Sequence, residues 1–423
     1  MIWETVIGLE THVQLSTKTK LFSRASTTFG KSPNTNVNLI DCGLPGVLPS
    51  VNKEAFYKAI RFGMAIGSKI NQTSIFDRKN YFYADLPKGY QITQMDLPIV
   101  LGGKIDIETD SGIKTINITR AHLEEDAGKS IHDEFDGFSA IDLNRAGTPL
   151  LEIVSEPEIS NAKEAVSYMK AMHQLVTFLD VSDGNMSQGS LRCDANVSIR
   201  KKGDSKLGTR TEIKNINSFK FIEKAFNFEI KRQIQVLESG ETVVQETRLY
   251  DSSKDETRPM RSKEFANDYR YFPEPDLLPV VISDSEMQEI KDHFPELPKE
   301  KEARYQNEYG LTIYDAQIIA SSKSMADFFD TAVQKTKNYT LLSNWLIGEI
   351  SAFLNKEIIE INESKLSAEN VAVLINRIDD QTISGKIAKS IFEEMCSSGA
   401  VSYTHLRAHE TRGNIVCRLL LEK

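Results

Sequence analysis

The stretch Lys104–Ser130 reads KIDIETDSGIKTINITRAHLEEDAGKS and contains the two features around which the chain is organised. Isoleucines alternate with polar residues on both sides of an Asp-Ser-Gly turn, which predicts a β-hairpin. The second strand runs into three consecutive carboxylates, Glu124–Asp126, preceded by His122. Neighbouring carboxylates raise one another's pKa unless cations or hydrogen-bond donors offset their repulsion. The acidic stretch therefore lies either in water or against a positive partner, and the rest of the chain favours the partner.

Strand-like alternation also gathers polar groups on single strand faces. Thr5–Leu15 places Glu10 and His12 on one face, about 6–7 Å apart, opposite a row of aliphatic residues. A half-exposed strand with a polar outer face is the alternative. The segment around Arg192 and Asp194 alternates in the same way, and one of its faces carries only charged, hydroxyl or amide groups. Such a face is unusual if it meets only solvent.

A further carboxylate, Glu152, lies inside the apolar run Leu-Leu-Glu-Ile-Val. A charge in such a run is partly buried and needs a partner, unless the strand is an edge strand that turns the side chain to water. The candidate constellation is rich in oxygen and comprises Glu10, His12, Glu124, Glu125 and Glu152. Carboxylates with one imidazole favour a hard divalent cation such as Mg²⁺ or Mn²⁺, which could also bind nucleotide phosphates.

Two other motifs bear on nucleotide binding. Asp77–Ile92 interleaves tyrosines with basic residues in a predicted Pro/Gly loop, a composition that suits base stacking and phosphate neutralisation. A loop anchored by buried tyrosines is the alternative. Gly128-Lys129-Ser130 resembles the end of a P-loop, but the glycine required five positions earlier is Leu123, and the adjacent carboxylates would repel a triphosphate. The P-loop is therefore rejected.

Length and composition limit the class of protein. At 423 residues the chain predicts two or three domains. The four cysteines form no CxxC pair, which argues against a disulfide framework and a cysteine zinc site. The net charge of −9 argues against nucleic-acid binding through the overall field, although one positive face remains compatible with it. No apolar run is long enough for a membrane span and no targeting segment is recognisable, so we expect a cytoplasmic protein.

Helical patterns follow and alternate with the strands. Amphipathic helices are predicted over Glu54–Gly67, over Asn161–Asp180 with Ser160 or Asn161 as its N-cap, and from Phe219 to near Gly240. After Pro295 and Pro298 the character changes to a helical bundle. Its predicted helices are Lys299–Asn307, Ser324–Lys335, Leu341–Leu354 and Ile375–Met395. Residues 401–423 match neither pattern and resemble translated adapter sequence, so we predict an anomalous, artefactual tail.

The motifs together resemble the B subunit of the three-subunit tRNA-dependent amidotransferases, over about residues 1–400. The resemblance rests on six ordered segments: Ile7–His12, His122–Ser130, Asp142–Pro157, Ser190–Asn196, Lys214–Phe219 and Tyr269–Asp276. It implies an α+β protein, with a mixed α/β catalytic cradle for ATP, Mg²⁺ and the aminoacyl-tRNA 3′ end over residues 1–293. A helical domain over 294–400 follows, and the family's C-terminal tail domain is expected to be missing.

The resemblance also implies a reaction. ATP phosphorylates the side-chain carboxylate of misacylated Glu-tRNA(Gln) or Asp-tRNA(Asn), and ammonia from a partner amidase, the A subunit, then displaces the phosphate. A small C subunit braces the pair. The carboxylate needs this activation because it is a poor electrophile, and phosphoryl transfer depends mainly on positioning and charge neutralisation. A non-catalytic tRNA-binding scaffold is the alternative, since no known nucleotide motif is present.

Site residues are implied position by position. The metal positions fall on His12, Glu125 and Glu152, with Glu10 beside them. The catalytic candidates are Glu125, Glu124 and Glu10, because a carboxylate can bind ammonium and accept its proton. The candidates for contacts with nucleotide, acyl group and tRNA end are Lys79, Tyr81, Lys88, Arg192, Asp194, Lys214 and Asn215.

The chain departs from the family in the segment where some members carry a four-cysteine zinc knuckle. The corresponding positions here are Ser23, Ala25, Asn38 and Asp41, so we predict no structural zinc.

Overall fold

The computed structural model describes residues 2–131, 137–260 and 268–398. The predicted anomalous segment 401–423 lies outside these residues. The chain divides into two compact units, Met1–Phe294 and Pro295–Lys423. The described part of the first unit combines a large sheet with helices, and that of the second is helical, which confirms the predicted α+β class.

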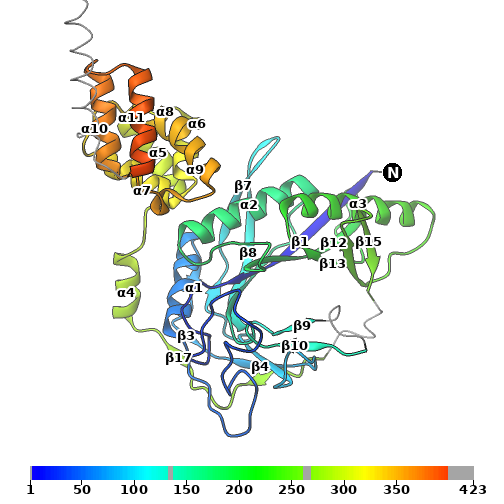
Figure 1. The fold of residues 1–423 in the computed structure, drawn as a ribbon. Coiled ribbons are helices and arrows are strands. Elements are labelled where there is room, and N and C mark those ends of the chain that lie inside the picture. Colours follow the sequence, from blue (N-terminus) through cyan, green and yellow to red (C-terminus); the bar gives the residue numbers. More distant parts are fainter. Residues whose placement is uncertain (1, 132–136, 261–267, 399–423) are drawn as a thin grey trace, which may run out of the picture. The chain divides into compact units, whose positions relative to one another are not determined.

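The first unit is built on a ten-stranded sheet (Figure 1). Its strands follow the order β15-β14-β13-β12-β1-β11-β8-β6-β2, and β7 pairs separately with β8. The bounds are β1 (Trp3–Gln14), β2 (Lys69–Ile70), β6 (Val100–Leu101), β7 (Lys104–Thr109), β8 (Gly112–Glu125), β11 (Pro149–Ser155), β12 (Leu191–Lys201), β13 (Thr211–Ile216), β14 (Thr247–Asp251) and β15 (Glu256–Pro259). Neighbouring strands are antiparallel, except that β13 and β14 are parallel. The β7–β8 pair is the hairpin predicted from the sequence.

Helices α2 (Ala162–Phe178) and α3 (Phe219–Glu238) cover one face of this sheet (Figure 1). The aliphatic residues of β1 point to them, and the Thr11 hydroxyl donates to the Met169 sulfur on α2 at 3.6 Å. The predicted N-cap of α2 is confirmed, because the Asn161 side chain accepts from the Glu164 amide. Helix α1 (Lys53–Ala65) packs against β6 and β8. The other face of β1, which carries its polar side chains, is thus left for the site.

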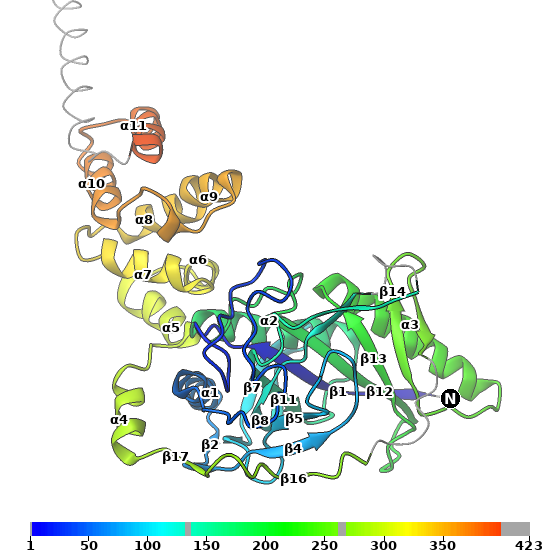
Figure 2. The same cartoon turned by 60° about the horizontal axis from the view of Figure 1, so that its bottom comes forward.

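Short strands lie opposite that polar face. The segment Asp77–Ile92, predicted as a loop, is instead a hairpin at its ends, with β4 (Asp77–Asn80) paired to β5 (Tyr90–Thr93). The difference arises because β4 also pairs with the distant β16 (Phe272–Pro273), a contact that local sequence does not encode (Figure 2). Two further pairs are β9 (Lys129–Ile131) with β10 (Ala140–Asp142), and β3 (Thr73–Ser74) with β17 (Val280–Val281). Helix α4 (Asp284–Asp292) ends the unit.

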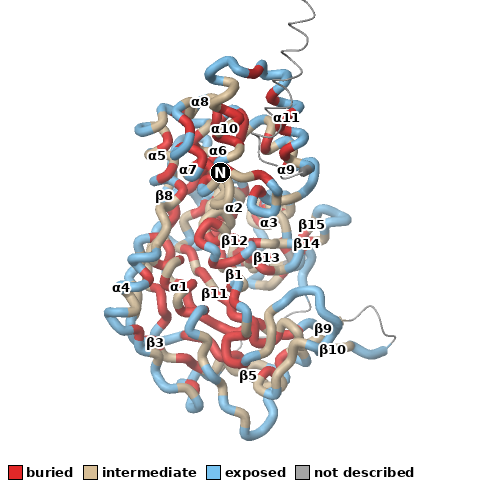
Figure 3. The backbone as a smooth tube through the Cα atoms, turned by 60° about the vertical axis from the view of Figure 1, so that its left-hand side comes forward, coloured by how far each residue is buried: buried red, intermediate tan, exposed pale blue. Residues whose placement is uncertain are grey.

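Buried residues concentrate in the sheet and in the helices packed on it, whereas the peripheral loops are exposed (Figure 3). The largest buried side chains include Phe56, Phe62, Tyr168 and Phe226 from α1, α2 and α3. The core therefore lies on the helix-covered side of the sheet and holds the strands of the opposite, polar face in a fixed register.

The helical unit contains α5 (Pro298–Tyr309), α6 (Ile313–Ala320), α7 (Lys323–Ala332), α8 (Tyr339–Trp345), a π-helical turn (Leu346–Ile350), α9 (Ser351–Glu357), a 3₁₀ turn (Ile361–Glu363), α10 (Ala368–Asp379) and α11 (Gly385–Ser398). The first three predicted helices are confirmed as α5, α7 and the continuous run from α8 to α9. The single helix predicted over Ile375–Met395 is wrong. Gln381 has φ of 59° and separates α10 from α11. Helix α6 was not predicted.

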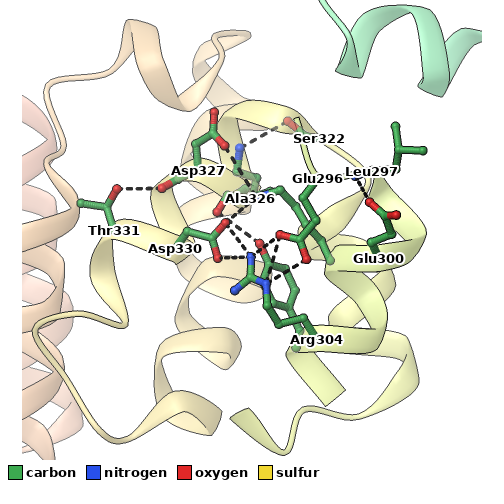
Figure 4. Close-up of polar contacts among 12 residues, drawn as sticks. Glu296, Leu297, Glu300, Arg304, Ser322, Ala326, Asp327, Asp330 and Thr331 are labelled. Atoms are coloured by element: carbon green, nitrogen blue, oxygen red, sulfur yellow. Dashed lines mark hydrogen bonds and ion pairs between the residues drawn. The ribbon is translucent and has the colours of Figure 1, made fainter. Parts of the chain in front are cut away.

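An ion-pair network joins α5 to α7 (Figure 4). Arg304 binds Glu296 at 2.7–3.0 Å and Asp330 at 3.0–3.1 Å. Lys301 pairs with the same Asp330 carboxylate. Because one carboxylate accepts from two cations on α5, this network fixes the packing of these two helices.

Candidate acidic active site

Strand register builds the site. Opposite His12 on β1 stand Glu152 on β11 and Arg192 on β12, and Glu152 is in turn opposite His122 on β8. Residues directly opposite one another in an antiparallel pair point to the same face. A row of one arginine, two histidines and one carboxylate therefore crosses four strands, in the order Arg192, His12, Glu152 and His122, on the face that α2 and α3 leave free.

Four side chains form a compact group, which we call the central cluster: His12, His122, Glu124 and Glu152. The His12 Nε2 atom lies 3.5 Å from Glu152 Oε2 and 3.9 Å from Glu124 Oε1. The His122 Nε2 atom lies 3.5 Å from Glu152 and 3.8 Å from Glu124. The side chains are between 4% and 17% exposed, and His122 Nδ1 is buried without a hydrogen-bond partner among the described residues.

The charges of the cluster are strongly coupled. Burial opposes the charged form of His122, but the carboxylates of Glu152 and Glu124 outweigh it and raise the pKa of His122 to about 9. Burial likewise opposes the charged form of His12, but Glu152 and Glu124 outweigh burial and raise the pKa of His12. The pKa of Glu152 lies well below its usual value, because the two histidines outweigh its burial. The sequence predicted that a buried Glu152 needs a partner, and the structure places the imidazoles of His12 and His122 beside it.

The donor set fits a hard divalent cation. One atom each from His12, Glu124 and Glu152 lies within 4.8 Å of the others. Two carboxylate oxygens with one imidazole nitrogen are ligands that Mg²⁺ and Mn²⁺ accept. The structure therefore brings together the predicted His12 and Glu152, with Glu124 as their third member.

The Glu125 carboxylate does not join the central cluster. It pairs with Lys88 and accepts from the Ile92 backbone N–H at 3.0 Å. Both side chains of this pair are nearly buried. The repulsion expected between consecutive carboxylates is thus offset because each has its own basic partner: Glu124 lies beside the two histidines and Glu125 pairs with Lys88.

Asp126, the third carboxylate, has its own cations. Its Oδ2 atom accepts from Gln14 at 2.7 Å and lies 3.1 Å from Arg192 and 3.6 Å from Arg145. The two arginines outweigh burial and lower the pKa of Asp126. Arg192, predicted to contact nucleotide or tRNA, is thereby tied to the acidic stretch.

Glu10 lies on the same face as His12 but outside the three-ligand set. Its carboxylate accepts from the Asn196 amide at 3.1 Å. Burial, followed by the charge of Glu152, raises the pKa of Glu10. Glu10 therefore adds a carboxyl group two residues along the strand from His12, one of the three candidate ligands.

The remaining predicted binding residues differ in how far their charges are already paired. Lys214 on β13 binds Asp194 at 2.9 Å and Glu212 at 3.0 Å. Asn215 is also on β13, and its side chain lies outside the described residues. Lys79 on β4, by contrast, forms no hydrogen bond or ion pair with any residue that the structure describes. It is half-buried, and although burial opposes the shift, Glu124 and Glu152 raise its pKa.

A cavity of about 770 Å³ is connected to the central cluster through Arg192, which lines it and stands opposite His12, whereas no residue of the cluster itself lines it. Gln14, Arg192 and Asp194 line it from the sheet, and Lys129 and Arg145 line it from the segments opposite. Its volume lies within the range of sites that hold a nucleotide-sized ligand. The cavity thus presents several cations next to a candidate divalent-ion site.

The segment predicted to lack zinc is held by a carboxylate. The buried Asp41 accepts at Oδ2 from Lys20 at 2.9 Å, from Ser23 at 3.3 Å and from the Asn38 backbone N–H at 2.8 Å. Lys20 is fully buried as well. Three of the four positions that correspond to the zinc knuckle therefore meet in one hydrogen-bonded group.

The sequence did not assign a role to three residues that the structure brings to the site. His122 could have been predicted as a site residue from the sequence, because it stands two residues before Glu124 on one strand and therefore lies on the same strand face. Tyr269 lies against Lys79, whose Nζ is 4.9 Å from the ring centroid, and Tyr271 neighbours Tyr269. No local signal could place these two tyrosines there, because β16 brings them to β4 from far along the chain.

Comparisons with known proteins agree with this architecture. A family described as the GatB/GatE catalytic domain matches residues 5–288, and one described as the GatB domain matches residues 327–408, reaching into the segment predicted to be anomalous. The chain is 58% identical over 398 residues to the B subunit of the aspartyl/glutamyl-tRNA(Asn/Gln) amidotransferase of Pseudomonas syringae, covering 94% of this chain and 83% of the relative. The protein of the same description from Azotobacter vinelandii is 58% identical over 403 residues, covering 95% and 84%. Among the described residues, no helix has the length and apolar character of a membrane span.

Proposed function

Because the chain belongs to the family of aspartyl/glutamyl-tRNA(Asn/Gln) amidotransferase B subunits, we propose that it activates and amidates the acyl group of misacylated tRNA. In this reaction ATP phosphorylates the side-chain carboxylate of Glu-tRNA(Gln) or Asp-tRNA(Asn), and ammonia then replaces the phosphate. An amidase partner, the A subunit, supplies the ammonia, and a small C subunit completes a cytoplasmic heterotrimer. The family name of the relatives supports the substrates, and the site below supports the chemistry.

The observation that carries the proposal is the central cluster beside the cavity. His12, Glu124 and Glu152 would hold Mg²⁺, which supplies charge neutralisation for phosphate and carboxylate groups that would otherwise repel each other. Glu124 and Glu152 place carboxylate oxygens in a site largely removed from solvent, since their side chains are 4% and 13% exposed. The nucleotide would occupy the 770 Å³ cavity, where Lys129, Arg145 and Arg192 reduce the cost of placing phosphates near carboxylates.

Lys79 would bind the anionic group that reacts. Its ammonium is half-buried, has no described hydrogen-bond or ion-pair partner, and lies in the field of Glu124 and Glu152. A positive charge without an anion in such a place is stabilised by a substrate carboxylate or phosphate. We therefore assign Lys79 to orientation of the acyl carboxylate or the transferred phosphate.

Glu125 and Glu10 would act on ammonia. Glu125 is held by Lys88 and by the Ile92 amide, so its position is fixed before substrate arrives. A carboxylate binds ammonium through strong charge-assisted hydrogen bonds and can accept a proton from it. Burial raises the pKa of Glu10, which brings its carboxyl group closer to the range where proton exchange is useful.

The test uses the complete heterotrimer. Wild type and Glu152→Gln are supplied with misacylated tRNA, labelled ATP and ammonium chloride, and acyl phosphate and amidated tRNA are measured separately. We expect Glu152→Gln to lose both products while the partner's glutaminase activity continues. A non-catalytic scaffold would instead retain the activity of wild type, and that result would reject the proposal.

A further inference from the structure

Four tyrosines gather beside the acidic end of β8, and we call them the tyrosine cluster: Tyr81, Tyr83, Tyr269 and Tyr271. Tyr81 meets Tyr83 and Tyr269 with ring centroids 5.7 and 6.0 Å apart, and Tyr269 meets Tyr271 at 6.0 Å. All three contacts are edge-to-face, with interplanar angles of 69–72°. Tyr81 was predicted from the sequence to contact nucleotide, acyl group or tRNA end, and the reaction proposed above assigns a role to none of the four rings.

The cluster is held by a specific backbone clamp. Asn80 donates its N–H to the Tyr269 carbonyl at 2.9 Å, and its side-chain amide donates to the carbonyls of Tyr269 and Arg270 at 3.1 and 2.8 Å. Arg270 takes φ of 44°, a left-handed conformation that costs free energy for a side-chain-bearing residue. The neighbouring β4–β16 pairing keeps the two segments together.

The tyrosine rings are not all buried in the protein core. Tyr83 is 53% and Tyr271 38% exposed, whereas most large side chains on the helix-covered side of the sheet are buried. Exposed tyrosine rings held in place offer flat apolar faces at little entropic cost. Lys79 Nζ lies 4.9 Å from the Tyr269 centroid and 5.8 Å from that of Tyr81, and it has no described anionic partner. Aromatic faces next to a lysine form the combination that binds unpaired nucleotides, by stacking on the base and pairing with phosphate.

Hydrogen bonds connect the cluster to the acidic stretch. The Tyr81 hydroxyl donates to Gln91 Oε1 at 3.3 Å, and the Gln91 amide donates to the Glu125 carbonyl at 2.7 Å. On the same strand β5, the Thr93 hydroxyl donates to Glu124 at 3.3 Å. The cluster thus adjoins the residues at which the acyl group would react.

We propose that the tyrosine cluster binds an unpaired nucleobase at the acceptor end of the aminoacylated RNA, with Lys79 facing the adjoining anionic group. The inference rests on the proposed function, since the acyl group must reach the central cluster while attached to the terminal nucleotide. The base next to that attachment point then falls beside β8. The adenine of ATP offers the same chemistry, so the experiment separates the two sources.

The variants are Tyr83→Leu and Tyr271→Leu, chosen because both rings are partly exposed, with Tyr83→Phe and Tyr271→Phe as matched controls that keep the ring. The assay measures amidated tRNA formed by the complete heterotrimer, with KM determined separately for misacylated tRNA and for ATP. Loss of one stacked base is expected to raise KM for tRNA about 5- to 150-fold. The phenylalanine controls should stay within about 2-fold of wild type, and KM for ATP should not change.

A second measurement tests RNA binding directly, without requiring catalysis. Binding of a fluorescent single-stranded RNA tetranucleotide ending in adenosine, followed by anisotropy, should weaken in the leucine variants and persist in the phenylalanine variants. A rise in KM for ATP alone would overturn the assignment to RNA, and unchanged KM and RNA affinity in both leucine variants would overturn the stacking site. Absence of amidated product from the wild-type heterotrimer would instead reject the proposed function.

Discussion

Replacing Glu124 and Glu125 one at a time separates two roles for adjacent carboxylates. Glu124 lies among the atoms that could hold a divalent cation, with His12 and Glu152. Glu125 instead neutralises Lys88. Glu124→Gln should therefore weaken cation binding, whereas Glu125→Gln should destabilise the fold and leave cation binding largely intact.

The magnitudes follow from the contacts. A divalent ion about 2.1 Å from a carboxylate oxygen gains roughly 4 kcal/mol of Coulomb energy even at the dielectric constant of water. The glutamine oxygen can still coordinate and removal of the charge lowers the desolvation cost, so we expect a loss of about 30- to 1000-fold in Mn²⁺ affinity for Glu124→Gln. In Glu125→Gln, Lys88 is 6% exposed and loses its counter-charge, which costs about 3–5 kcal/mol.

The assay pairs two measurements on each purified variant. Free Mn²⁺ is followed by electron paramagnetic resonance during titration, and the free energy of unfolding is obtained from urea denaturation. The double variant Lys88→Met with Glu125→Gln is the control, because removing both members of a buried pair is far less costly than removing one. If Glu125→Gln lost as much Mn²⁺ affinity as Glu124→Gln and kept wild-type stability, the assignment of Glu124 to the cation and Glu125 to Lys88 would be refuted.

Three further predictions concern single groups. His122→Ala should raise Mn²⁺ affinity about 10-fold, because the pKa of about 9 leaves His122 protonated and its positive charge competes with the ion for two carboxylates; a lower affinity by the same titration would contradict this. Glu229→Gln should lower the free energy of unfolding by about 3–5 kcal/mol, because the fully buried carboxylate binds Arg232 at 2.6 and 3.0 Å. Burial raises the pKa of Glu229, but hydrogen bonds from Arg232, Gln233 and Thr257 outweigh burial and lower this pKa overall. The ionised carboxylate therefore stabilises the fold above about pH 5, and this stabilisation is lost as pH falls below about 4. Urea denaturation across this range should show a weaker pH dependence of the free energy of unfolding for Glu229→Gln than for wild type. Asp41→Ala should cost about 3–5 kcal/mol by leaving the buried Lys20 unpaired, and a melting temperature equal to that of wild type would contradict this.

Local sequence was sufficient for much of the fold. The alternation in β1 and β12, the hairpin β7–β8 and the N-cap of α2 were predictable, because each depends on residues close together in the chain. The same logic failed over Ile375–Met395, where the apolar periodicity runs through a turn at Gln381 that separates two helices. Periodicity describes which face is apolar, and it does not record where the chain changes direction.

The sequence by itself determined that His12, Glu124 and Glu152 lie on strands with polar faces, and that the charges on such faces require partners. Tertiary structure decided which partners they have. Register across β1, β11 and β8 brought His122 close to both Glu124 and Glu152, and the β4–β5 hairpin brought Lys88 and the Ile92 amide to Glu125. Strand order and register depend on packing against α2 and α3 and on long-range pairing, so the assignment of each carboxylate to a cation could not be read from neighbouring residues alone.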